Sequence, residues 1–326
     1  MKIAIYGAGA IGGVRGGQLA RSGQDVTLSA RGPHLEAMRA NGLTLELGCE
    51  KTVVPVRCTD DTRSVGPQDA VVLAVKAHSV TPALEHIRPL LGEQTSVVTA
   101  QNGILWWYFH RHGGPYDGRR LELADPGGKI WDALGPERAI GCVVYPSCEI
   151  VSPGVIRHIE GNRFMLGEPD GSKSARVTAL SEAFGAAGMK APVRTKIRDD
   201  IWFKLLGNAT FNPVSVLTNA TLGLMGSDTH GRDVIRTLMR EAEAVATALG
   251  VEFAMSLEKR IDGATAVGDH KTSMLQDLEA GRPLELDALV AAVSELGRLV
   301  GVPTPAIDLV LALVKLKLST RAGRPS

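Results

Sequence analysis

The feature that most constrains the fold is a glycine-rich segment close to the N-terminus, Gly7-Ala8-Gly9-Ala10-Ile11-Gly12. It follows a short apolar run over residues 2–6, which predicts a strand, and opens a run of small residues up to Ser22, which predicts a helix. In such a unit the first glycine permits the tight turn, the second lets a pyrophosphate approach the backbone, and the third allows close helix–strand packing. The N–H groups at the start of the helix would then bind the anion. The six residues therefore predict a dinucleotide site, with an ordinary turn as the alternative.

Strand-like and helix-like segments alternate through the first half of the chain. Strands are predicted over residues 26–30, 69–75, 96–100, 139–145, 155–160 and 163–166, a hairpin over 43–57, and helices near 82–91 and 174–187. Apolar residues on both faces of the strands are typical of a parallel sheet covered by helices. From about residue 198 onward the pattern is helical, including 232–249, 284–300 and 305–318, with a frayed polar tail at 321–326. We therefore expect an α/β Rossmann-type N-terminal domain over residues 1–196 and an all-α C-terminal domain over residues 197–326.

Composition excludes several classes of protein. The 326 residues carry a formal net charge of +1, whereas a nucleic-acid-binding or anionic-membrane-binding surface would need a basic excess. No segment approaches the roughly 20 apolar residues that cross a bilayer, and the N-terminus lacks the pattern of a secretory signal. The four cysteines form no CxxC pair, so neither a zinc site nor a disulfide scaffold is expected. We expect a cytoplasmic protein with no metal, no nucleic-acid partner and no membrane attachment.

The ends of three further predicted strands bear on the cofactor. NAD-preferring sites carry an Asp or Glu about 20 residues beyond the glycine segment, whereas this chain has Ser29-Ala30-Arg31 there. A guanidinium suits a phosphate, so Arg31 is predicted to bind the 2′-phosphate of NADPH, a plain surface charge being the alternative. Lys76 and Asn102 also stand directly after apolar strands. Because ligands of open α/β sheets bind at the carboxyl ends of strands, both residues are predicted to join the same edge.

The helical half contains two groups of polar residues. Lys204, Asn208 and Asn212 are spaced four apart and share one face of a predicted helix. Their neighbours are apolar or aromatic and asparagine is a poor helix former, which favours an enclosed polar face over a solvated stripe. Ser273 and Glu285 lie on either side of a Gly-Arg-Pro break. Glu285 begins the next helix, and capping of that helix is its alternative role.

These motifs resemble those of the ketopantoate reductase (2-dehydropantoate 2-reductase) family, and the resemblance covers most of the chain. It is carried by GAGAIG with Arg31, VKAHS with Lys76, QNG with Asn102, K-x-x-x-N-x-x-x-N-P over 204–213, and SMLQD followed by Glu285. The resemblance implies an NADPH-binding Rossmann domain and a helical substrate and dimerisation domain, with NADPH in the cleft between them. It also implies reduction of the C2 keto group of 2-dehydropantoate to (R)-pantoate, on the route to pantothenate and coenzyme A.

The resemblance further implies roles for individual residues. Lys204 would be the catalytic lysine, assisted by Glu285, and the substrate would be bound by Asn102, Asn208, Asn212, Ser273 and Glu285. The cofactor would be bound by Gly7, Ala8, Gly9, Ala10, Ile11, Gly12, Arg31, Lys76 and Asn102. The chemistry is compatible with these roles, because hydride attack on a keto carbon builds negative charge on its oxygen, which a nearby cation or acid stabilises.

Two features depart from the family pattern. His270 stands where an asparagine is typical, and it is either a substitute hydrogen-bonding group or an exposed histidine. An insert at about residues 104–132 is rich in aromatic residues. It is either a hydrophobic cluster under a long loop or a lid that reshapes the substrate pocket.

These departures leave a different 2-oxo acid or an imine open as the substrate of the same two-domain plan. A non-catalytic NADPH-binding sensor is a third alternative, although it would have no use for Lys204 and Glu285 together. The last predicted helix carries an apolar stripe that serves either a homodimer contact or the core of the domain, formed by Leu309, Leu311, Leu313 and Leu316.

Overall fold

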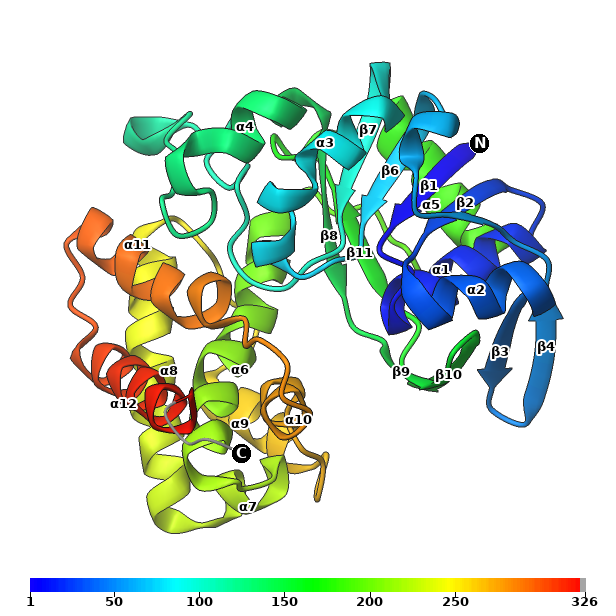
Figure 1. Cartoon of the computed structure of the whole chain (residues 1–326). Helices are drawn as coiled ribbons and strands as arrows, with labels where there is room; N and C mark the ends of the chain where they lie inside the picture. Colours follow the sequence, from blue (N-terminus) through cyan, green and yellow to red (C-terminus); the bar gives the residue numbers. More distant parts are fainter. Residues whose placement is uncertain (323–326) are drawn as a thin grey trace. The chain divides into compact units, whose positions relative to one another are not determined.

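The structure is a computed structural model that describes residues 1–322, with side chains described through residue 320. The chain divides into two compact units, Met1–Ile197 and Arg198–Ser326 (Figure 1). Most of the predicted polar tail, at residues 321–326, lies outside the described residues. A search of the described helices finds none with the length and hydropathy that a membrane span requires. The cofactor-binding and substrate-binding roles of the two domains stay predictions.

A seven-stranded sheet forms the centre of the first unit (Figure 1). Its strand order is β11-β8-β7-β6-β1-β2-β5, and neighbouring strands are parallel except for β11 and β8. Val71 and Val72 point to opposite faces and are both fully buried, so both faces of the sheet are covered. This arrangement confirms the predicted α/β Rossmann-type domain. The strands are β1 (Lys2–Tyr6), β2 (Asp25–Ser29), β5 (Arg57–Thr59), β6 (Gln68–Leu73), β7 (Leu91–Thr99), β8 (Ala139–Val144) and β11 (Phe164–Gly167).

The helices of this unit are α1 (Ala10–Arg21), α2 (Gly32–Asn41), α3 (Leu84–Ile87), α4 (Lys129–Leu134) and α5 (Ala175–Ala186). The predictions of α1 and α5 are confirmed, whereas α2 is an addition to the predicted elements. The prediction of one helix over residues 82–91 is wrong. There α3 is flanked by the 3-10 turns Thr81–Ala83 and Arg88–Leu90, because Pro82 and Pro89 supply no backbone N–H.

A second sheet of order β4-β3-β10-β9 also packs against α1. It contains β3 (Leu43–Leu47), β4 (Glu50–Val54), β9 (Ser147–Ser152) and β10 (Val155–Glu160). β3 and β4 form the predicted hairpin, whereas β9 is an unpredicted strand with four exposed residues. Glycines let α1 approach both sheets. A Cβ added at Gly16 would lie 2.2 Å from Leu28 Cδ2 of the main sheet. A Cβ added at Gly13 would lie 2.2 Å from Ile156 Cδ1 of the second sheet.

The aromatic insert is packed into the first unit. The side chains of Trp106, Trp107, Tyr108 and Phe109 are buried, and Trp107 Nε1 donates to Thr99 Oγ1 on β7 at 2.9 Å. At the start of α4, buried Asp125 accepts the Ile130 and Trp131 N–H groups at 2.8 and 2.9 Å. This burial favours a hydrophobic cluster over a lid formed by these aromatic side chains.

The secondary structure of the second unit is helical in all of its described residues that form regular elements, which confirms the predicted all-α domain. Its helices are α6 (Ile197–Thr218, which begins at the last residue of the first unit), α7 (Leu222–Ser227), α8 (Thr229–Ala248), α9 (Leu257–Thr265), α10 (Ser273–Glu279), α11 (Ala292–Val300) and α12 (Pro305–Ala322). A π-helical turn, Asp287–Ala291, leads into α11.

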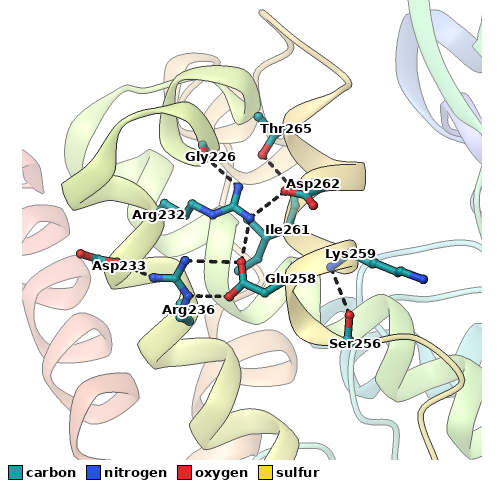
Figure 2. Close-up of polar contacts among 10 residues, drawn as sticks. All are labelled: Gly226, Arg232, Asp233, Arg236, Ser256, Glu258, Lys259, Ile261, Asp262 and Thr265. Carbon is teal, nitrogen blue, oxygen red and sulfur yellow. Dashed lines mark hydrogen bonds and ion pairs between the residues drawn. The ribbon is translucent and has the colours of Figure 1, made fainter.

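Two arginines of α8 bind two carboxylates of α9 (Figure 2). Arg232 Nη2 lies 2.7 Å from both Glu258 Oε2 and Asp262 Oδ1, and Arg236 Nε lies 2.6 Å from Glu258 Oε1. The two guanidinium groups lower the pKa of Glu258 from 4.5 to about 2. The network is therefore complete above pH 4.5 and is lost as the pH falls toward 2. Because the side chains of Glu258 and Asp262 are 48% and 62% exposed, the network contributes more to the placement of α9 than to the free energy of unfolding.

A glycine contact brings α7 against α9. A Cβ added at Gly226 would lie 1.8 Å from Thr265 Oγ1 and 2.8 Å from Thr265 Cβ. We expect Gly226→Ala to lower the free energy of unfolding by about 1–3 kcal/mol, because the helices must move apart to accommodate the methyl group. Urea unfolding of both variants measures this. The matched control is Gly263→Ala in α9, where a Cβ meets no atom within 4 Å. It should leave stability unchanged or raise it by up to about 1 kcal/mol, and equal losses in both variants would contradict the contact.

Candidate functional site

The glycine segment has the local geometry that its spacing predicts. Gly7 has φ +103°, a value that favours glycine. A Cβ added at Gly12 would lie 2.0 Å from the Gly7 carbonyl oxygen and 2.9 Å from Ala74 Cβ, so α1 starts in direct contact with the turn. A Cβ added at Gly9 meets no protein atom within 4 Å. The turn is therefore closed on its protein side and open beside Gly9, which fits the approach of a pyrophosphate to the backbone.

A pocket of about 230 Å³ lies at this turn. Pockets that enclose a whole ligand usually measure roughly 300–1,000 Å³, so this one fits part of a dinucleotide. The Gly7 and Ala8 N–H groups donate to the Ser29 carbonyl oxygen at 3.3 and 2.8 Å, which joins the turn to the end of β2. The pocket is lined by Tyr6, Gly7, Ala8, Gly9, Ser29, Ala30, Arg31, His34, Val75 and Ile150.

Arg31 is the cation among the residues that line this pocket, and it is the N-cap residue of α2. Its charge acts on the Tyr6 hydroxyl, whose pKa is raised by burial and lowered by Arg31 to a lesser extent. An exposed guanidinium beside the first turn of a helix is suited to a phosphate group. The structure therefore places Arg31 where the sequence analysis expects a 2′-phosphate, while its role stays a prediction.

Lys76 and Asn102 follow β6 and β7, which are neighbours in the sheet. The two strand ends are tied together, because Gln101 Nε2 donates to the Val75 carbonyl oxygen at 2.8 Å. Both side chains are half-buried. Gly7, Arg31, Lys76 and Asn102 thus stand at the carboxyl ends of four adjacent parallel strands, as the sequence pattern predicts.

His34 is a pocket residue that the sequence analysis does not identify. Its Nδ1 atom accepts the Gly154 N–H at 3.0 Å, and burial lowers the pKa of its imidazole. The sequence feature that could have identified it is its position three residues after Arg31, in the first turn of α2. The helix over residues 32–41 is not among the predicted elements, so the sequence pattern does not place His34 at the pocket.

The predicted polar face in the second unit lies on one helix. Lys204 and Asn208 of α6 are half-buried, and Asn212 is buried with 4% of its surface exposed. Asn212 Nδ2 has no hydrogen-bond partner among the described residues. A buried amide donor without a partner argues against a solvated stripe at Asn212.

The start of α10 lies beside α6. Ser215 Oγ donates to the Asn212 carbonyl oxygen at 2.7 Å and lies 2.5 Å from Thr272 Oγ1, the N-cap residue of α10. This contact brings Ser273, an exposed residue, close to the turn of α6 that carries Asn212. Glu285 immediately precedes the helical turn that starts at Leu286, and its carbonyl oxygen accepts the Leu289 N–H at 3.2 Å. The half-buried His270 precedes α10, and its carbonyl oxygen accepts the Leu222 N–H at 3.0 Å.

Comparison with known proteins places the chain in a family. Residues 3–106 match the family model described as ketopantoate reductase PanE/ApbA, and residues 196–318 match the model of its C-terminal part. A 2-dehydropantoate 2-reductase of Mesorhizobium japonicum is 58% identical over 324 residues, which cover 99% of each chain. A crystal structure of a candidate ketopantoate reductase from Ralstonia solanacearum MolK2 superposes with a TM-score of 0.93 at 45% identity and covers 98% of each chain.

A crystal structure of 2-dehydropantoate 2-reductase from Geobacter metallireducens GS-15 superposes with a TM-score of 0.85 at 28% identity, and the match covers 97% of this chain and 100% of that one. Both halves of the chain and its full length are therefore matched. The chain belongs to the ketopantoate reductase family and is an oxidoreductase that acts on a CH–OH group.

Proposed function

We propose that this protein reduces the C2 keto group of 2-dehydropantoate to (R)-pantoate with NADPH, a step on the route to pantothenate and coenzyme A. The observation that carries the proposal is the glycine pocket with Arg31 at its rim, in a chain that matches a named 2-dehydropantoate 2-reductase along its full length. The substrate is accordingly a small 2-oxo acid. The cofactor is a nicotinamide dinucleotide, and Arg31 in place of an acidic residue supports NADPH.

In this proposal the first unit holds the cofactor. The pyrophosphate lies in the open space beside Gly9 and is bound by the N–H groups at the start of α1. Ala8, Ala10 and Ile11 lie on either side of it. Arg31 binds the 2′-phosphate, and Lys76 and Asn102 contact the part of the dinucleotide that reaches the ends of β6 and β7. When bound, NADPH supplies the hydride.

The second unit supplies the polar groups that act on the substrate. Lys204 donates a hydrogen bond and then a proton to the C2 oxygen, where negative charge develops as the hydride arrives. Glu285 positions the lysine or binds the substrate hydroxyl. Asn102, Asn208, Asn212 and Ser273 hold the substrate, and the amide donor of Asn212, whose hydrogen bond is unmade among the described residues, supports this role.

The pair Gly9→Ala and Gly12→Ala tests the glycine pocket. At Gly9 a methyl group has space in the protein, and the extended backbone, with φ −68° and ψ −166°, is one that alanine adopts without strain. It would occupy the space assigned to the pyrophosphate. We expect an unchanged melting temperature and a KM for NADPH raised roughly 10-fold or more, since several hydrogen bonds to charged oxygens are lost. Gly12→Ala should lower the melting temperature, because its Cβ would lie 2.0 Å from the Gly7 oxygen. An unchanged KM in a stable Gly9→Ala protein would contradict the pocket assignment.

The variant Lys204→Ala tests the proton donor. We expect kcat to fall on the order of 10²–10³-fold, as is typical when one such donor is removed, with little change in NADPH affinity. Lys259→Ala is the matched control, since Lys259 is an exposed lysine of α9 in the same unit (Figure 2). Steady-state kinetics with 2-dehydropantoate measures both variants. A nearly unchanged kcat in Lys204→Ala would remove this residue from the mechanism.

We further propose a cytoplasmic homodimer formed through the second unit. A groove of about 860 Å³ is lined mainly by apolar residues of α6, α7, α8 and α12. Of the predicted leucine stripe, Leu309, Leu313 and Leu316 are 61%, 43% and 60% exposed, whereas Leu311 is half-buried. Leu309 and Leu313 both line the groove and are exposed. An exposed apolar face of this kind can pair with a second copy of itself about a two-fold axis.

Sedimentation equilibrium tests the dimer. We expect the mass of two chains for the wild-type protein and of one chain for the double variant Leu309→Glu and Leu313→Glu, because the charges would be buried in the contact. Val267→Glu is the control, since Val267 is exposed on the same unit and does not line the groove. A monomeric wild-type protein, or a double variant that remains dimeric, would contradict this contact.

A further inference from the structure

One wall of the cofactor pocket comes from outside the Rossmann sheet. Ile150 of β9 lines the pocket together with Arg31 and Gly9, although β9 belongs to the second sheet. Figure 1 shows β9 and β10 next to α1, and both strands contact that helix. Ile150 is 45% exposed, so its side chain is accessible to a ligand that enters the pocket.

The turn between β9 and β10 is fastened to α2 by His34. The Gly154 N–H donates to His34 Nδ1 at 3.0 Å, and a Cβ added at Gly154 would lie 2.9 Å from Ala37 Cβ of α2. The Gly154 carbonyl oxygen also accepts the Thr44 N–H of β3 at 2.8 Å. The hairpin that carries Ile150 is thus tied both to its own sheet and to α2, the helix that Arg31 caps.

The same imidazole reaches the glycine turn. Because burial lowers the pKa of His34, the ring is neutral near pH 7, and the bond from Gly154 places its single proton on Nε2. Nε2 is buried and has no hydrogen bond of normal geometry to the described residues, and the ring interacts with the backbone of Ala8. His34 therefore stands between the glycine turn, the start of α2 and the β9–β10 hairpin.

We propose that Ile150 is an apolar platform for the adenine base of the cofactor and that His34 is the positioning residue that holds this platform against the glycine turn. The inference rests on the proposed use of NADPH. Arg31 is the phosphate-binding end of the pocket, and the base attached to the same ribose must lie beside it. Ile150 and Val75 are the large aliphatic side chains of the lining. A purine presents flat apolar faces, and an aliphatic side chain packs against such a face.

The platform is tested by dissociation constants of the full chain for NADPH and NADH, measured through the fluorescence of the reduced nicotinamide. Ile150→Ala should weaken both cofactors to the same extent, by roughly 5- to 30-fold, since the adenine base is common to both. Ile159→Ala is the matched control, because Ile159 is a 49% exposed isoleucine of the same sheet that does not line the pocket. It should leave both constants within about twofold of the wild-type values. Adenosine 5′-monophosphate, a competitor without nicotinamide or 2′-phosphate, should lose affinity in Ile150→Ala in parallel.

The positioning role is tested by His34→Ala and His34→Gln. His34→Ala should raise the KM for both cofactors and leave kcat at saturating NADPH unchanged, whereas His34→Gln should restore most of the affinity, because its carbonyl oxygen can accept the Gly154 N–H. A lower melting temperature with an unchanged KM would show that His34 only stabilises the fold, and it would overturn the positioning role. Unchanged dissociation constants in Ile150→Ala would overturn the platform.

The variant Arg31→Ala distinguishes a failure of this inference from a failure of the proposed function. We expect this variant to weaken NADPH and not NADH, because only NADPH carries the 2′-phosphate. An equal effect on the two cofactors would overturn the NADPH assignment, and it would leave the platform standing if Ile150→Ala still weakened both.

Discussion

The cofactor pocket depends on the close approach of Gly12 to the carbonyl oxygen of Gly7. No side chain larger than hydrogen fits between them, since an added Cβ would lie 2.0 Å from that oxygen. With α1 seated directly on the turn, its first N–H groups are presented at the loop, and the space beside Gly9 remains open. The parallel order of β7, β6, β1 and β2 then sets Asn102, Lys76 and Arg31 at the same sheet edge.

Most of the residues at this edge of the sheet could be predicted from short sequence patterns. The glycine spacing, the apolar strand before it and the polar residues after three more strands depend on short stretches of chain, and the rule for carboxyl ends of parallel strands joins them. His34 and Gly154 are 120 residues apart, so no local pattern connects them. Ile150 lies on a strand whose residues are mostly exposed, which leaves no alternation of apolar and polar residues to detect.

The helical unit shows the same division. Four-residue spacing predicts that Lys204, Asn208 and Asn212 share a face, and α6 confirms it. Burial of Asn212 and its open amide donor depend on how α6 packs, and the contact between Ser215 and Thr272 depends on where α10 begins. The role of the aromatic insert could not be predicted from the sequence either. A run of large apolar residues predicts burial, but it does not distinguish a hydrophobic cluster from a lid.

The use of NADPH for ketopantoate reduction is tested most directly by the ratio of kcat/KM values for NADPH and NADH, measured on the wild-type protein with 2-dehydropantoate. A guanidinium at the end of β2, where an NAD site would carry a carboxylate, should favour the phosphorylated cofactor roughly 10-fold or more, the gain expected from hydrogen bonds to a charged group. A preference for NADH, or turnover of other 2-oxo acids with none of 2-dehydropantoate, would contradict the proposed function.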